Sequence, residues 1–282
     1  MGNRTAVIVA CALVGLTVST PAFADSPAPS TYGRASYLLD ESTGKAMISK
    51  RADKRVPIAS LTKIMTAYVV LGQAKLTDKV RITAKDVRYA ERGGATTADL
   101  RPGDRLTVKE LLYGLMLPSG ADAAHALART YGPGVDGFTA KMNATAKAMG
   151  LSNTSYVNAD GLPARGGDGY STARDQARLA AAALRNPTFR SVTSTKSRTV
   201  ASTADHRAYS WTNTNRMLDA PGSLGVKTGY TRAAGFNLAF AADRKGRRLV
   251  GVILGETDSS RRFDTARSLL KWAAKHPVEG NG

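Results

Sequence analysis

The run from Ile64 to Leu71 (IMTAYVVL) is apolar at every position except Thr66. A helix with this sequence has no polar face, so the rest of the chain must cover it on nearly every side. Just before this run, Lys63 follows Ser60 by three positions and is the only charged residue between Val56 and Gly72. A lone lysine here is costly to bury while charged. It must be neutral, have a special partner, or extend to the surface.

The N-terminus has the pattern of a secretory signal peptide. One basic residue, Arg4, precedes an apolar run from Ala6 to about Val18, and Ala22-Phe23-Ala24 fits an A-x-A cleavage site. Because the run is too short for a transmembrane anchor, we expect a signal peptide at residues 1–24 and a secreted, extracytoplasmic protein, in the cell wall or outside the cell. The alternative is a lipoprotein box ending at Cys11, but the apolar run continues past that residue.

Removal of the signal peptide would leave 258 residues, enough for one sizeable core of one or two lobes. It would also remove Cys11, the only cysteine, so the mature chain would have no disulfide, thiol nucleophile or cysteine metal site. The three histidines, His125, His206 and His276, lack the spacing of metal ligands. We therefore expect no metal and no cofactor.

The mature chain would carry 39 basic and 22 acidic residues, a net charge of +17. Such an excess suits an anionic partner. Export argues against nucleic acid, and so does the scatter of the charges, which form no basic run interleaved with aromatic residues. Electrostatic adhesion to an anionic cell wall is the simpler interpretation.

After a linker at residues 25–34, the patterns indicate an α+β fold of mixed α and β elements. The order of the elements predicts an antiparallel sheet completed by both ends of the chain and flanked by helices, with an inserted helical subdomain. The expected strands are a hairpin over 35–50 with its turn at 42–44, and a pair at 236–243 and 247–255 around Lys245-Gly246. The expected helices start near residue 60, at the capping box Thr107–Glu110, and over 137–150, 171–187 and 261–274.

Lysine can act as the base for a serine nucleophile, and S-x-x-K is the spacing that brings the two together. The chain has this spacing three times, at Ser42/Lys45, Ser60/Lys63 and Ser268/Lys271. The first lies in the expected turn and the third on the polar face of the last helix. Only Ser60/Lys63 is embedded in apolar sequence, which favours these two residues as the nucleophile and its base.

Two further stretches have little meaning alone. In LPSGAD, Pro118 ends a helix and places Ser119 on a loop. In GSLGVKTGYT, the residues Lys227-Thr228-Gly229 lie on a short expected strand, where a glycine allows close approach of a ligand to the backbone.

Together, these stretches match the S-x-x-K, S-x-N and K-T-G set of penicillin-binding proteins and class A β-lactamases. From about Ala35 to Trp272 the chain resembles the low-molecular-mass D-alanyl-D-alanine carboxypeptidases. The matching stretches include LMLPSGADAAHALA, FTAKMNATAKAMGLSNTSYVNADGL, STARDQARLA, TNTNRML and KTGYTRAAGFNLAFAADRKGRRLVGVILG. The resemblance implies a β-lactamase/transpeptidase-like catalytic domain over 35–275, with its helical subdomain at about 86–200 and a tail at 276–282.

The resemblance also implies a substrate and a chemistry. The substrate would be the D-Ala-D-Ala end of peptidoglycan stem peptides, and β-lactams would be covalent inhibitors. Ser60 would be the nucleophile at a helix N-terminus, and a neutral Lys63 would take its proton. Burial and the second cation Lys227 would lower the pKa of Lys63. Ser119 would bridge the two lysines and pass the proton to the departing D-alanine.

The remaining candidates would bind the substrate. The backbone N–H groups of Ser60 and Tyr230 would form the oxyanion hole. Lys227, Thr228 and Arg262 would hold the terminal carboxylate, with Arg261 as the neighbouring alternative to Arg262.

One position departs from the family pattern. Ala121 stands where the S-x-N motif has asparagine, so it can neither hydrogen-bond the substrate amide nor orient the lysine. The Y-x-N at Tyr156-Val157-Asn158 matches a different family segment and is not a replacement.

Other function classes stay open at this point. A strict DD-transpeptidase would share every motif. A class A β-lactamase needs a deacylating glutamate between the second and third motifs, and the chain has none between Glu110 and Glu256. A non-catalytic wall-binding relative would suit Ala121 and the positive charge, but not the intact Ser60, Lys63 and Ser119.

Overall fold

The computed structural model describes residue 2 and residues 27–92 and 95–277. Apart from Gly2, the predicted signal peptide lies outside the described residues, as do residues 278–282 of the expected tail. Among the helices of the described part, none has both the length and the apolar character that a membrane crossing requires.

The main sheet has five antiparallel strands in the order β2-β1-β11-β10-β9. They are β1 (Ala35–Asp40), β2 (Lys45–Lys50), β9 (Ser223–Thr231), β10 (Gly235–Arg244) and β11 (Arg247–Glu256). Strand β1 pairs with β11, from Ala35 opposite Leu254 to Asp40 opposite Leu249. The expected antiparallel sheet, completed by both ends of the chain, is confirmed.

The helices follow the capping and stop signals closely. They are α1 (Thr62–Leu71), α2 (Ala84–Arg92), α3 (Val108–Met116), α4 (Ala121–Tyr131), α5 (Gly134–Ala148), α6 (Ala173–Leu184), α7 (Pro187–Thr193) and α8 (Arg261–Ala273), with 3₁₀ turns η1 (Ala59–Leu61) and η2 (Arg216–Asp219). The Thr107–Glu110 capping box is formed at the start of α3. Pro187 ends the α6 region as expected, and it also occupies the first turn of a further helix, α7, where its fixed φ is favourable.

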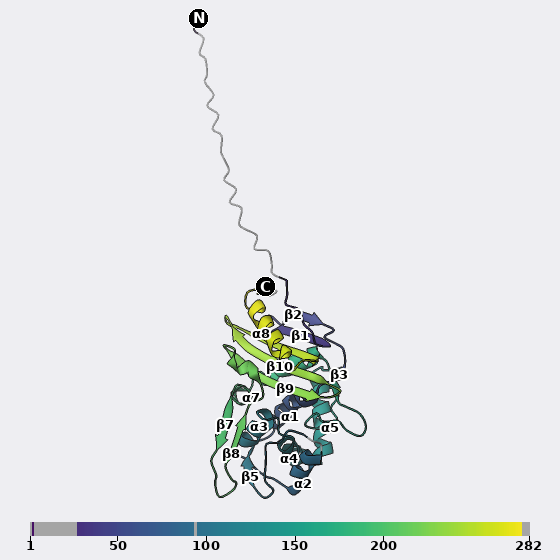
Figure 1. The fold of residues 1–282 in the computed structure, drawn as a ribbon, viewed down its shortest axis with the longest axis vertical. Helices are drawn as coiled ribbons and strands as arrows, with labels where there is room; N and C mark the ends of the chain where they lie inside the picture. The colour runs from purple at the N-terminus through teal and green to yellow at the C-terminus, as the bar shows by residue number, and fades with distance from the viewer. Residues whose placement is uncertain (1, 3–26, 93–94, 278–282) are drawn as a thin grey trace.

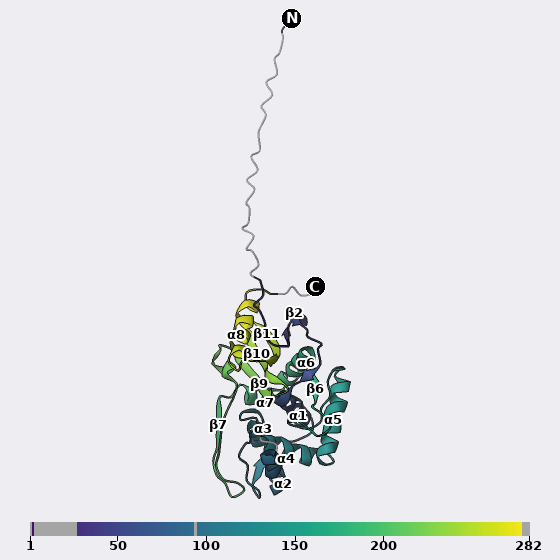
Figure 2. The same cartoon turned by 45° about the vertical axis from the view of Figure 1, so that its right-hand side comes forward.

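The two faces of the sheet are covered by different helices (Figures 1 and 2). On β10, Leu238 and Phe240 pack in a cluster with α8, whereas the alternate residues Ala239 and Ala241 belong to the main core, to which α6 contributes. Successive side chains of a strand point to opposite faces, so α8 and α6 lie on opposite sides of the sheet. Strands β10 and β11 are therefore buried on both faces along most of their length.

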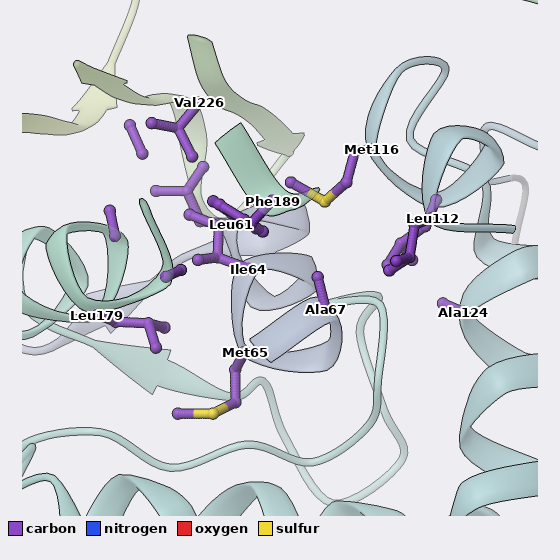
Figure 3. Close-up of a cluster of buried hydrophobic side chains, with 14 of the residues drawn as sticks. Leu61, Ile64, Met65, Ala67, Leu112, Met116, Ala124, Leu179, Phe189 and Val226 are labelled. Carbon is purple, nitrogen blue, oxygen red and sulfur yellow. The ribbon is translucent and has the colours of Figure 1, made fainter. Parts of the chain in front are cut away.

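Helix α1 lies at the centre of the molecule, as its apolar sequence requires. It contacts α3, α4, α5 and α6. Figure 3 shows Leu61 and Ile64 surrounded by side chains from α6, α7, α3 and β9, among them Leu179, Phe189 and Val226. A helix packed on all sides is a rigid base for the residues at its N-terminus.

The helices α2 to α5 lie together at the end of the molecule away from α8 (Figure 1). Small two-stranded sheets complete the architecture: β3 (Val56–Pro57) with β6 (Tyr170–Ser171), β4 (Lys79–Arg81) with β5 (Arg105–Thr107), and β7 (Ser197–Val200) with β8 (Tyr209–Thr212). Helix α6 falls within the range 86–200 given above for the helical subdomain, yet it packs against β1, β10 and β11.

Candidate active site

Ser60 lies on the 3₁₀ turn η1, directly before α1, in a tightly built segment. The preceding residue, Ala59, has a φ of +49°, which is uncommon for a residue with a side chain. Gly161 packs against this turn, and a Cβ added to it would come within 1.9 Å of the Ala59 carbonyl oxygen. Only glycine fits at residue 161, so the loop that contains it is held directly against Ser60.

Lys63 is buried and does not extend to the surface; its exposed fraction is 1%. Its Nζ atom lies 3.0 Å from the Oγ of Ser60 and donates a 2.9 Å hydrogen bond to the main-chain carbonyl of Asp160. Burial lowers the pKa of Lys63 to about 8, although the nearby carboxylates of Asp160 and Asp122 act in the opposite direction. A large fraction of this amine is therefore neutral near pH 8.

Ser119 lies on the turn between α3 and α4 with a φ of +70°. Its carbonyl oxygen accepts a hydrogen bond from Thr96, which ties the turn to the segment that follows α2. Its hydroxyl is buried and has no hydrogen-bond partner among the described residues, so it does not bridge the two lysines in this structure. A strained residue with an unpaired buried hydroxyl is unusual outside functional sites.

Strand β9 brings four of the candidate residues to the same place. It is a nine-residue edge strand, longer than expected. Lys227 is 1% exposed. Its pKa lies well below the usual value, mainly because of burial and also because of the nearby charges of Lys63 and Arg262. Thr228 shares a 2.7 Å hydrogen bond with the hydroxyl of Thr214, and Tyr230 is 56% exposed.

Gly229 makes a close backbone contact within the protein, in addition to the approach of a ligand that was expected there. A Cβ at this position would lie 3.0 Å from the Ile58 carbonyl oxygen and 3.1 Å from the backbone nitrogen of Ser60. The missing side chain therefore lets β9 approach the Ser60 turn, and Gly229 also lines the cleft. The glycine sets the width of the gap between the strand and the serine.

The structure shows which of the two adjacent arginines faces the cleft, a choice that the sequence left open. Arg262 is 9% exposed and donates hydrogen bonds to the carbonyls of Gly229 and Asn237 at 3.3 Å and 3.0 Å. Burial lowers its pKa to about 10, so it remains a cation at neutral pH. Arg261 turns away and donates a 2.6 Å hydrogen bond to Glu256.

Most of these residues line one cleft of about 320 Å³. Seven of the eight candidates line it, namely Ser60, Lys63, Ser119, Thr228, Gly229, Tyr230 and Arg262. Lys227 does not line the cleft and is buried in β9. Ser42 lies in its turn bonded to Asp40, and Ser268 is exposed on α8, so neither competing S-x-x-K serine reaches the cleft.

Sequence reasoning missed several lining residues. Ala95, Thr96, Leu162 and Thr214 also line the cleft, and each comes from a loop. Thr214 and Leu162 had a usable signal, since they lie in the matching stretches TNTNRML and FTAKMNATAKAMGLSNTSYVNADGL. It also missed the part played by Asp160, which reaches Lys63 through its main chain.

The structure also shows where Ala121 and Asn158 lie, the two residues considered for the asparagine position of the second motif. Ala121 is fully buried at the start of α4, and its backbone nitrogen donates to the Thr96 carbonyl. Asn158 hydrogen-bonds within its own loop, to the backbone of Gly161 and Leu162, and does not line the cleft. It is therefore no replacement for the missing asparagine of the second motif.

The arrangement suits acyl transfer to a hydroxyl. A serine hydroxyl at the start of a buried helix faces an amine whose pKa is lowered, which is the combination needed to activate a weak nucleophile. Thr228 and the cation Arg262 line the same cleft and favour an anionic ligand.

Comparisons with known proteins agree with this description. The family model of D-alanyl-D-alanine carboxypeptidase, peptidase family S11, matches residues 23–258. The D-alanyl-D-alanine carboxypeptidase of Streptomyces sp. (strain K15) is 38% identical over 281 residues, which cover 95% of this chain and 94% of the relative. Escherichia coli DacC is 36% identical, and the match covers 87% of this chain but 62% of that relative. For Bacillus subtilis DacF the values are 34%, 85% and 61%.

Solved structures show the same fold. The crystal structure of the Streptomyces DD-transpeptidase has a TM-score of 0.83 and 39% identity, covering 88% of this chain and 98% of that one. A penicillin-binding protein homologue from Mycobacterium tuberculosis also has a TM-score of 0.83, at 30% identity, covering 92% and 98%. The α+β fold expected from the resemblance is thereby confirmed, and the chain belongs to the D-alanyl-D-alanine carboxypeptidase family of serine peptidases.

Proposed function

We propose that this protein is a secreted serine D-alanyl-D-alanine carboxypeptidase that acts on peptidoglycan stem peptides through an acyl-enzyme and is inhibited by β-lactams. The observation that carries the proposal is the 3.0 Å contact between Ser60 Oγ and the buried amine of Lys63, whose pKa is lowered to about 8. The carboxypeptidase names of the relatives support the substrate.

Acylation begins when the neutral amine of Lys63 takes the proton of the Ser60 hydroxyl. The freed oxygen attacks the carbonyl carbon of the penultimate D-alanine, and the carbonyl electrons move onto its oxygen. Collapse of this intermediate breaks the peptide bond, and the terminal D-alanine nitrogen receives a proton through Ser119. The unpaired hydroxyl of Ser119 is then satisfied by substrate. Water attacks the ester in the second half and regenerates Ser60.

Two sets of groups bind the substrate. The backbone N–H groups of Ser60 and Tyr230 stabilise the oxyanion, and Gly229 allows β9 close enough to pair them. Loss of one such donor costs on the order of a hundredfold in rate. Thr228 and Arg262, which line the cleft, hold the terminal carboxylate by hydrogen bonding and charge.

A strict DD-transpeptidase is the second candidate, because the solved Streptomyces relative bears that name. The two activities share the acyl-enzyme and differ in whether water or an amine attacks it. Release of D-alanine from a stem peptide without added amine supports the carboxypeptidase, whereas release that depends on an acceptor amine supports the transpeptidase.

Labelling with a fluorescent penicillin tests the shared mechanism. Stable labelling of wild type that Ser60→Ala abolishes, and that the matched control Ser268→Ala retains, is the expected result. Rapid turnover of the label identifies a β-lactamase, and no labelling identifies a non-catalytic wall-binding relative. An adduct on Ser119 would show that the nucleophile is misassigned.

Secretion and wall adhesion are also part of the proposal. The N-terminal pattern supports export, and the net charge of +17 after cleavage supports adhesion to an anionic wall. Fractionation should find the protein outside the cell membrane, and salt should release it from the wall because salt screens exposed charges. Recovery only with detergent, even at high salt, would contradict this.

A further inference from the structure

A second and larger cavity, of about 740 Å³, adjoins the active-site cleft. Helix α2 contributes Lys85, Arg88 and Tyr89 to its lining, α4 contributes His125, and Arg165 comes from the loop after Asp160. Leu162 lines both cavities, so a single side chain forms the boundary between them. Nothing in the acylation mechanism uses this second space.

The lining carries positive charge that no acidic side chain neutralises. Lys85, Arg88 and Arg165 are exposed, and within the described part of the chain none of them forms an ion pair. No acidic residue lines the cavity. Unpaired cations around a concave site raise the local concentration of an anionic ligand.

Two carboxylates next to lining residues already have partners. Asp86 is buried beneath the cavity, where it accepts hydrogen bonds from His125 at 2.6 Å and Arg129 at 3.0 Å. The Asp160 side chain lies near Tyr89 and accepts a 2.8 Å hydrogen bond from the backbone of Leu162. Neither carboxylate competes with an incoming anion for the three exposed cations.

Contacts through Tyr89 and Asp160 link the cavity wall to Lys63. The ring of Tyr89 packs against that of His125, with the centroids 4.5 Å apart and the planes tilted by 31°, which holds it in the cavity wall. Burial and the nearby Asp160 carboxylate raise the pKa of Tyr89. The Asp160 carbonyl accepts the hydrogen bond from Lys63. One residue therefore separates the cavity wall from the amine of Lys63.

We propose that this cavity binds a free carboxylate of the stem peptide, upstream of the bond that is cleaved. The inference rests on the proposed function and deepens it, because it assigns a specificity site for part of the substrate beyond D-Ala-D-Ala. A peptide whose terminus lies in the cleft reaches the cavity by passing Leu162, and a carboxylate on it meets Arg88, Lys85 and Arg165. A phosphate of an anionic wall polymer has the same charge, so the test must separate the two sources.

The test uses two synthetic peptides that end in D-Ala-D-Ala and differ only in one upstream group, a free carboxylate or its carboxamide. Wild type should have a higher kcat/KM for the carboxylate peptide. The double variant Arg88→Gln/Arg165→Gln should reduce this preference by about tenfold, as expected for two partly exposed charge contacts. The control Arg244→Gln/Lys271→Gln removes two surface cations on and near α8 and should retain the preference. Melting temperatures report whether each variant is folded.

The outcomes separate the proposals. Equal losses on both peptides, or no change in preference, would overturn the carboxylate site. Inhibition of wild type by a glycerol-phosphate oligomer that the double variant escapes, with no preference between the two peptides, would assign the cavity to a wall polymer and overturn it also. If wild type hydrolyses neither peptide, the proposed function itself fails.

Discussion

The amine of Lys63 is anchored to the main chain of Asp160, 97 positions further along the sequence, by a 2.9 Å hydrogen bond. One turn along α1, the hydroxyl of Thr66 donates a 2.6 Å bond to the carbonyl of Ala159. These two bonds fasten the central helix to the loop over the cleft. The position of the amine is therefore set by the packing of that loop as well as by its own helix.

Replacement of Lys63 by arginine should lower the rate of β-lactam acylation by orders of magnitude. Arginine keeps the charge and a similar reach, but a guanidinium does not lose its proton in a protein and cannot act as the base. The rate of adduct formation by stopped-flow fluorescence or mass spectrometry measures the effect. The exposed Lys271→Arg is the matched control and should keep the wild-type rate. Near wild-type acylation by Lys63→Arg would require another base.

The acylation rate of wild type should rise with pH up to about 8, because the base must be neutral and the pKa of Lys63 is lowered to about 8. The Asp160 carboxylate acts to raise this pKa. Asp160→Asn keeps the main-chain carbonyl but removes that charge, so the acidic limb of the profile should move to lower pH. An unchanged profile in Asp160→Asn would show that the limb belongs to another group.

Lys63→Met should show that the buried lysine costs stability. The pKa of Lys63 is about 8 in the folded protein and 10.5 in the unfolded chain, so the unfolded chain binds the proton more tightly. Wild type should therefore gain on the order of 3 kcal/mol relative to the variant as pH rises from 7 to 10.5. Chemical denaturation at several pH values measures the difference. A constant difference over this range would contradict the lowered pKa.

Ser119→Gly and Ser119→Ala should differ in stability but not in activity. Both remove the hydroxyl and should impair acylation alike. Glycine tolerates the φ of +70° at this position, whereas alanine does not, so the glycine variant should be more stable by about 1 kcal/mol. Thermal unfolding monitored by circular dichroism gives the difference. Higher activity in one variant would mean that the backbone, rather than the hydroxyl, limits the reaction.

Sequence patterns predicted the elements that depend on local periodicity. The apolar run around Ile64 required a covered helix, and the order of the elements predicted an antiparallel sheet completed by both ends of the chain. The cleft was harder to predict, because Thr96, Leu162 and Thr214 come from three separate loops that no regular periodicity brings together. The contact between Gly229 and the Ser60 turn depends on how β9 packs against η1, which no single segment determines. Arg261 and Arg262 could be separated only by the rotation of α8 on the sheet.

The pairing of β1 with β11 has a consequence for how the protein is made. Leu38 is synthesised early, but its partner Gly251 lies far along the sequence and is synthesised much later. Until then β1 lacks one neighbour, and Arg262 has not yet been added to the site that Ser60 began. Such distant pairing slows folding and leaves strand edges open while it is incomplete. A growing chain therefore cannot assemble this cleft until β9 to β11 and α8 have been synthesised.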